Sequence, residues 1–177
     1  MTPAVGGLWW RTRFAFAGDD ATLAAQLVDA GGAMVAWRAL EGDEVCVYDD
    51  GPGVAWPAGA ERVALRGTLV LAGAAAGAPA GWHYVVETDV LPSMEDEFNA
   101  WYREEHLPGL AAVPGTVVAW RAVRVGDGPR YTAGYDLASR ETFGSPPWLA
   151  VRATAWSDRV RPAFRSTRRT LYRRLVY

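Results

Sequence analysis

The chain contains 177 residues, half of which are hydrophobic, and its 18 basic and 20 acidic side chains give a formal net charge of −2. This composition excludes an intrinsically disordered chain, and the balanced charge argues against nucleic acid as a partner. A lone cysteine, Cys46, excludes an intramolecular disulfide and a cysteine-based zinc site, which favours a reducing, cytoplasmic location.

Residues 1–72 predict four strands and one short helix. The helix is expected at about residues 20–30, with Asp19 or Asp20 as its N-cap. No room remains for a second helix before the fourth strand, so this half is a degenerate unit. Strands are expected at residues 8–16, at 35–39, in a run that ends at Tyr48-Asp49, and at 62–71.

Residues 73–81 contain only Gly, Ala and Pro and predict a linker. Beyond it, residues 82–177 predict a complete β-α-β-β-α-β unit. The basic run at residues 165–174 is expected to be the solvated side of the last strand. The longest apolar stretch, residues 68–76, is too short to cross a membrane. The elements expected in this half are a strand at 82–90, a helix at about 93–107 capped by Ser93, strands at 118–122 and up to Tyr135-Asp136, a helix at about 148–159, and a strand at about 167–177.

The motif VAWRA occurs at residues 35–39 and again at 118–122. Five consecutive matches, together with the same order of strand, helix and turn signals, indicate an internal repeat. A four-stranded sheet with helices on one face leaves its other face apolar, and two such sheets can cover each other. We therefore expect an α+β fold in which two ferredoxin-like halves form an internal, pseudo-dimeric α/β barrel. A monomer is the default, and a homodimer through edge strands stays open.

The segment EDEFNAWYREEHLP at residues 95–108, which closes at Val113-Pro114-Gly115, resembles the first-helix signature of EthD-like and related dimeric α/β barrel proteins. The Trp-Tyr, Glu-His-Leu-Pro and Val-Pro-Gly pieces carry this resemblance, which covers mainly residues 82–137. It implies a ferredoxin-like fold with a pocket between sheet and helices. That superfamily includes cofactor-free monooxygenases, polyketide cyclases, isomerases and dehydratases, and the fold does not choose among them. The first half lacks the Glu-His-Leu-Pro helix, so a site on that helix would occur once.

The predicted helix at residues 93–107 carries the main candidates for catalysis. Phe98, Tyr102 and His106 are spaced by four residues and share a face, with Trp101 in the neighbouring row. His106 is the leading candidate for a general acid or base, because imidazole titrates near neutral pH. Tyr102 would orient the substrate, and Phe98 and Trp101 would supply apolar walls. The alternative is that His106 only packs or bonds at the helix end.

The predicted strands add further candidates. His83 and Glu87 share one face of the strand at residues 82–90 and could act on a substrate, although an exposed strand end explains His83 equally well. Arg121 could stabilise a carboxylate or enolate, or it could pair with an acid across strands. Core packing is the alternative for the remaining candidate binding residues, Trp120, Tyr131 and Tyr135.

Missing motifs narrow the chemistry further. The chain has no lysine, which excludes a lysine Schiff base, and it lacks dinucleotide, phosphate-loop and nucleophile-elbow motifs. No cofactor and no metal are expected, and the expected partner is a small molecule rather than a membrane. The first hypothesis is a cyclase, isomerase or dehydratase that moves a proton on an apolar, oxygenated or aromatic polyketide-like molecule. The alternatives are a cofactor-free monooxygenase of phenols and a non-catalytic ligand-binding or accessory protein.

Overall fold

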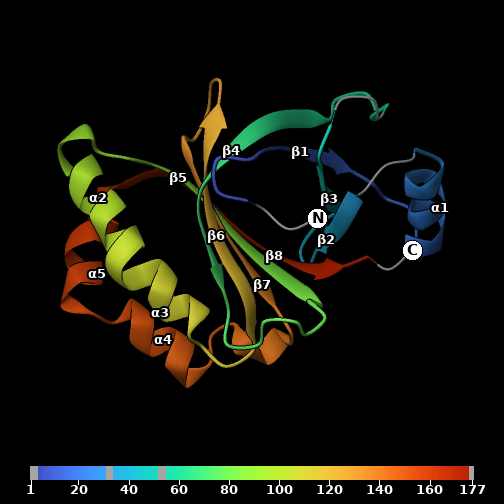
Figure 1. Ribbon diagram of the computed structural model, residues 1–177. Coiled ribbons are helices and arrows are strands. Elements are labelled where there is room, and N and C mark those ends of the chain that lie inside the picture. Colours follow the sequence, from blue (N-terminus) through green and yellow to red (C-terminus); the bar gives the residue numbers. More distant parts are fainter. Residues whose placement is uncertain (1–3, 31–33, 52–54, 176–177) are drawn as a thin grey trace.

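The protein is described here by a computed structural model that covers residues 4–30, 34–51 and 55–175. Its centre is a closed barrel of eight antiparallel strands in the order β1-β3-β2-β8-β5-β7-β6-β4 (Figure 1). The fold is therefore α+β, as expected. The strands are β1 (Leu8–Ala15), β2 (Met34–Ala39), β3 (Glu44–Asp49), β4 (Glu61–Ala72), β5 (Trp82–Val90), β6 (Thr116–Val125), β7 (Tyr131–Leu137) and β8 (Phe164–Arg174).

Each half of the chain supplies four neighbouring strands, in the order β4-β1-β3-β2 and β8-β5-β7-β6. In each half the fourth strand therefore lies beside the first strand, and the second strand lies at the far edge. The halves meet at two seams of unequal length. The β4–β6 seam pairs residues 64–72 with 118–125, whereas the β2–β8 seam pairs residues 37–39 with 172–174.

Helices cover the two sides of the barrel unequally (Figure 1). Helix α1 (Asp20–Ala30) lies on one side, and the Asp19 carboxylate accepts a hydrogen bond from the Thr22 backbone N–H at 2.8 Å, which confirms its predicted capping role. The opposite side carries α2 (Glu95–Trp101), α3 (Leu107–Ala111), α4 (Pro146–Arg152) and α5 (Ala155–Val160). No helix in the described ranges combines the length and the apolar character that a membrane span requires.

Four details of the predicted elements in the second half are wrong. Ser93 lies inside a short 3₁₀ turn and does not cap α2 with its side chain, and the helix continues past residue 107 to Ala111. The single helix expected at residues 148–159 is two helices, because the chain turns before Thr154, whose hydroxyl caps α5. The last strand begins at Phe164, and its predicted end at residue 177 lies outside the described residues.

The barrel interior is filled by aromatic side chains from both halves. Trp37 and Trp120, the tryptophans of the repeated motif, are both buried there, as the alternation of strand residues requires. Gly134 on β7 lies opposite Trp120, and a Cβ at this position would come within 2.2 Å of the indole ring. Glycine is therefore the residue that lets Trp120 lie flat against the strand.

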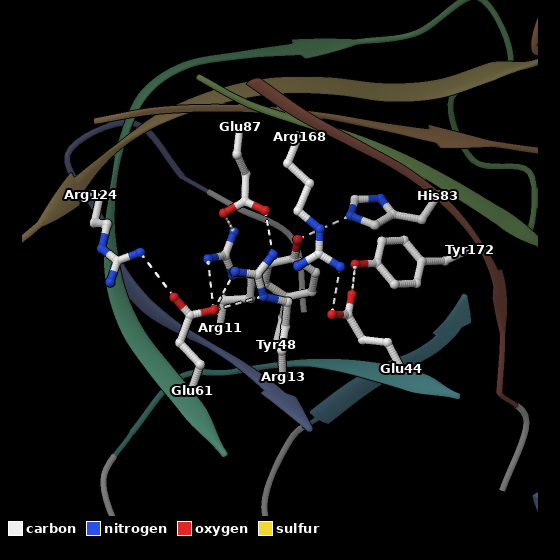
Figure 2. Close-up of polar contacts among 10 residues, drawn as sticks. All are labelled: Arg11, Arg13, Glu44, Tyr48, Glu61, His83, Glu87, Arg124, Arg168 and Tyr172. Carbon is white, nitrogen blue, oxygen red and sulfur yellow. Dashed lines mark hydrogen bonds and ion pairs between the residues drawn. The ribbon is translucent and has the colours of Figure 1, made fainter. Parts of the chain in front are cut away.

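A network of charged side chains crosses the same interior (Figure 2). Arg11 of β1 contacts Glu87 of β5 at 2.6 Å, and Arg13 bridges Glu87 and Glu61. Glu61 also pairs with Arg124 of β6 at 3.1 Å. These contacts join strands of both halves, and removing Glu87 alone would leave the buried Arg11 with only Glu61, 4.0 Å away, as its counter-ion.

The arginines of the basic run on β8 are exposed, apart from the partly buried Arg173, which agrees with the expectation of a solvated run. Arg168 donates a hydrogen bond to Glu44 at 2.6 Å on the barrel side (Figure 2). Arg169 lies on the other face, where it lines a small cavity together with Tyr84. Alternation along the strand distributes these arginines between two different environments.

Candidate functional site

A groove of about 330 Å³ lies where α2 and the following helical turn meet β4, β6 and β7. The pairing of β4 with β6 shifts between Gly67 and Leu69, and this β-bulge places Thr68 and Leu69 at the groove. Bulges are common beside functional sites because they redirect side chains. The volume is at the lower end of the roughly 300–1,000 Å³ typical of small-molecule sites. The other lining residues are Asn99, Arg103, Arg121, Val123, Arg130 and Tyr131.

Arg121 lies at the buried end of this groove, with 7% of its surface exposed. Its Nη2 donates to Asn99 Oδ1 at 2.7 Å, while its Nε has no hydrogen-bond partner among the described residues. No carboxylate of the described ranges pairs with it. Burial lowers the pKa of Arg121, but a guanidinium group remains charged in proteins. The groove therefore ends in a buried cation that lacks a counter-ion from the described chain.

Three aromatic rings hold the Arg121 guanidinium in place. Its central carbon lies 4.8 Å from the Phe98 ring centre and 4.5 Å from those of Tyr102 and Tyr131. Ring faces stabilise a cation electrostatically but accept none of its strong hydrogen bonds. The arrangement fixes the position of the charge and leaves N–H donors available to a ligand.

Tyr131 connects the groove to a carboxylate near the surface. Its hydroxyl donates to Glu95 Oε1 at 2.5 Å and accepts from Asn99 Nδ2 at 3.4 Å. Arg130 also bonds Glu95, whose side chain is 31% exposed. Burial and then the hydrogen bond to Glu95 raise the pKa of Tyr131. This chain of hydrogen bonds can carry a proton from the groove to solvent.

The helix beside the groove contains a π-helical turn at Tyr102–His106 (η2). The Leu107 N–H bonds the Tyr102 carbonyl, five residues earlier. Pro108 explains this turn, because proline lacks an N–H and its ring would clash with the carbonyl of residue 104 in a regular helix. The wider turn lets Trp101 stack on His106, with ring centres 4.0 Å apart, while Tyr102 keeps contact with His106 at 5.3 Å. Such turns are frequent at functional sites.

His106, Trp101 and Tyr135 line a separate, small cavity of about 20 Å³ between the helices and the sheet, which is open on the side of the exposed Arg161 and Arg169. Tyr102 borders this cavity and also contacts Arg121 of the groove. Burial, followed by the nearby Arg152 and Arg161, lowers the pKa of His106 to about 3. The imidazole is therefore uncharged at neutral pH. Its predicted role as a general acid or base stays a prediction.

His83, Glu87 and Trp120 lie inside the barrel, on the other face of the sheet. His83 Nδ1 is 2.5 Å from Asp136 Oδ1 and its Nε2 is 3.1 Å from the Tyr48 hydroxyl, while Glu87 is held by arginines (Figure 2). His83 also stacks on Trp37 at 4.8 Å. The structure thus places the ten predicted site residues in three places: Arg121, Tyr131 and Phe98 at the groove, His106, Tyr102, Trp101 and Tyr135 at the small cavity, and His83, Glu87 and Trp120 in the barrel.

Sequence reasoning missed Asn99 and Glu95 at the groove and Arg152, Arg161 and Arg169 at the small cavity. Glu95 carried only the signal of an acid at a helix start. Asn99 precedes the Trp-Tyr pair but carries no pattern of its own. The three arginines come from α4, a 3₁₀ turn and β8, so only the tertiary fold brings them together.

Within the described ranges, no group of three or more His, Cys, Asp or Glu side chains is placed to hold a metal ion. The predicted absence of a metal site stays a prediction.

No protein-family model and no curated protein matches the chain. Solved structures match it along almost its whole length. An anthrone oxidase-like protein has a TM-score of 0.66 at 13% identity, covering 99% of this chain and 94% of the other. A ferredoxin-fold protein related to antibiotic biosynthesis monooxygenases, from Listeria monocytogenes, has a TM-score of 0.62 at 11% identity, with 97% and 96% covered. A heme-degrading enzyme from the same species has a TM-score of 0.58 at 12% identity, with 92% and 98% covered. At these identities the comparisons establish a shared fold, in which an antiparallel barrel of ferredoxin-like type carries helices on its outer face.

Proposed function

We propose that this protein is a cofactor-independent monooxygenase that ionises a phenolic, polycyclic aromatic substrate in the groove at Arg121. The observation that carries the proposal is the buried guanidinium without a counter-ion at the end of a ligand-sized groove. We further propose that the barrel is an internal pair of ferredoxin-like halves, of which only the second retains this site.

The charge on Arg121 favours an anionic substrate oxygen. A buried cation is costly unless it is paired, so a phenolate or enolate in the groove recovers electrostatic energy that the ligand-free protein lacks. Because the donors are already positioned, they stabilise charge that develops during ionisation. Leu69 and Val123 supply apolar walls for the aromatic part of the substrate.

The proton leaves through the hydrogen bonds around Tyr131. The Tyr131 oxygen accepts the substrate proton while its own hydroxyl proton moves to Glu95, which is exposed enough to exchange with water. His106 does not border the groove, so we assign it no role in this step.

The ionised substrate then supplies the electrons for oxygenation. A methylene group activated by flanking aromatic rings loses two hydrogens and forms a carbonyl double bond to one oxygen atom of O₂, and the second oxygen atom leaves with those two hydrogens as water. The anthrone oxidase-like neighbour favours this outcome over cyclisation or isomerisation, which share the ionisation step and differ in not consuming O₂.

The residues at the two spaces do not fit a heme. None of the described residues that line the groove is a histidine, cysteine or methionine that could be an axial ligand, and the tyrosine there is engaged by Glu95. His106 faces a cavity of about 20 Å³, which is far too small for a macrocycle. We therefore derive no step through heme.

The test compares Arg121→Gln with Arg38→Gln, its counterpart in the first copy of the repeat. Purified protein is supplied with a panel of hydroxylated anthrones, and O₂ uptake is measured together with the absorbance of the quinone product. We expect one O₂ consumed per product in the wild type, a loss of about 10²–10³-fold in kcat for Arg121→Gln, and little change for Arg38→Gln.

Thermal unfolding of both variants controls for misfolding. Product formation without O₂ uptake would replace the monooxygenase by an isomerase or cyclase that uses the same groove. Equal activity of the two variants would refute the role of Arg121, and failure of all substrates to bind would favour the accessory-protein hypothesis.

A further inference from the structure

The small cavity at His106 has properties that the proposed reaction does not use. It lies between the helical layer and strands β5, β7 and β8, and its volume of about 20 Å³ fits one particle the size of a water molecule. An aromatic molecule or an organic acid is too large for it. Size alone therefore restricts an occupant to a water, a diatomic molecule or a small inorganic ion.

Three buried polar atoms that lack partners belong to side chains that line this cavity. They are Nδ1 of His106, the hydroxyl oxygen of Tyr135 and Nε1 of Trp148, none of which finds a hydrogen bond within the described part of the chain. The indole N–H can only donate, the phenol can donate, and the imidazole nitrogen donates in one tautomer. Burial without partners costs free energy, so these groups favour an occupant that accepts hydrogen bonds.

Three arginines surround the same space with positive charge. Arg152, Arg161 and Arg169 all line the cavity, and none of them forms an ion pair with a described residue. Burial, and then repulsion from Arg152 and Arg169, lowers the pKa of Arg161, which shows how closely the three charges gather. Asp158 opposes this effect only in part. The local field favours a negative occupant over a neutral one.

We propose that this cavity binds one monovalent anion the size of a halide, such as chloride, through the donors of His106, Tyr135 and Trp148 in the field of the three arginines. The site is separate from the groove at Arg121 and does not depend on any reaction there. A bound anion would also favour the imidazolium form of His106, because it adds a negative charge beside a ring whose pKa the nearby Arg152 and Arg161 lower.

The experiment titrates sodium bromide into the wild-type protein at constant ionic strength, with sodium gluconate as the replacing salt because gluconate is too large for the cavity. The chain has two histidines, so His83 in the barrel serves as an internal reference for His106 in ¹⁵N-histidine NMR spectra. We expect a saturable shift of the His106 signals, unchanged His83 signals and a rise in Tm. Crystals grown in bromide should give one anomalous peak beside Tyr135.

Tyr135→Phe removes one donor while keeping the ring, and Tyr48→Phe is the matched control in the barrel. Because hydrogen bonds to charged groups are worth more than neutral ones, we expect Tyr135→Phe to weaken bromide binding at least tenfold and Tyr48→Phe to leave it unchanged. Arg161→Gln, on the exposed rim, should also weaken it without disturbing the core.

Each contrary result overturns the proposal. One such result is a bromide titration that shows no saturable change beyond that seen with gluconate, and another is an equal shift of the His106 and His83 signals. The others are an unchanged bromide affinity in Tyr135→Phe and a crystal in which the cavity holds only water. All of these readouts are independent of catalysis, so failure of the proposed monooxygenase activity would leave this test intact.

Discussion

The two copies of the VAWRA motif have the same place in the barrel but different surroundings. Arg38, in the first half, reaches Asp20 at 3.4 Å and the Phe16 carbonyl at 2.9 Å. Arg121, in the second half, has three aromatic rings and Asn99 instead, and a groove beside it. The strand fixes where the guanidinium points, whereas the covering helices decide whether its charge is neutralised. The same strand motif therefore places one arginine beside a carboxylate and the other beside an open groove.

The largest expected effect on stability concerns the packing around the two repeated tryptophans, Trp37 and Trp120. Cys46 lies opposite Trp37, and Gly134 lies opposite Trp120. Gly134→Ala forces a methyl group into the Trp120 ring and should cost about 3 kcal/mol, whereas Cys46→Ala removes one buried atom and should cost about 1 kcal/mol. Urea unfolding followed by tryptophan fluorescence measures both. Equal costs would show that Trp120 can move as freely as Trp37.

The second prediction concerns the pH dependence of protein stability that His106, in the second half, contributes. The folded pKa of His106 is about 3 against 6.5 in an unfolded chain, so the unfolded state binds the proton first as the pH falls. The contribution of the uncharged His106 to the free energy of unfolding is complete above pH 6.5 and is lost as the pH falls from 6.5 to 3. We expect His106 to account for about 2 kcal/mol of destabilisation between pH 7 and pH 5.

His106→Asn should remove that part of the pH dependence, which urea unfolding at the two pH values measures. A slope that persists unchanged in the variant would place the responsible group elsewhere. The measurement belongs in gluconate buffer, because an anion bound near the ring would itself alter the pKa of His106.

The smallest expected difference in stability is between the loss of two helix caps, one in each half. Asp19 caps α1 at the surface, and Asp19→Ala should cost about 1 kcal/mol. Thr154 caps α5 through the Ser157 N–H at 3.0 Å and also donates to Glu105 at 2.6 Å, which bonds the Trp101 indole. Thr154→Ala should therefore cost about 2 kcal/mol, and chemical denaturation resolves the two. A cost for Thr154→Ala no larger than that for Asp19→Ala would mean that the bond to Glu105 adds nothing.

Much of the candidate site follows from local sequence, but its grouping does not. The strand alternation correctly put Trp120 and Arg121 on opposite faces, and the helix spacing put Tyr102 near His106. Sequence gave no sign that Pro108 would widen the helix and stack His106 on Trp101. The sequence analysis also named both His83 and His106 as candidate catalytic residues, whereas the sheet separates His83 from His106. Local periodicity predicts on which face of a strand or helix a residue lies, but it does not predict which other element packs on that face.

The sequence by itself determined the α+β class, the order of strands and helices along each half, and the opposite faces of tryptophan and arginine in the repeated motif, because these depend on short-range alternation and on the repeat. Only the tertiary structure decided that Arg121 lacks a counter-ion and that Arg152, Arg161 and Arg169 meet beside His106. The physical reason is that charge neutralisation and cavity volume depend on distances between residues far apart in the chain. Such distances are set by how the helices pack on the barrel.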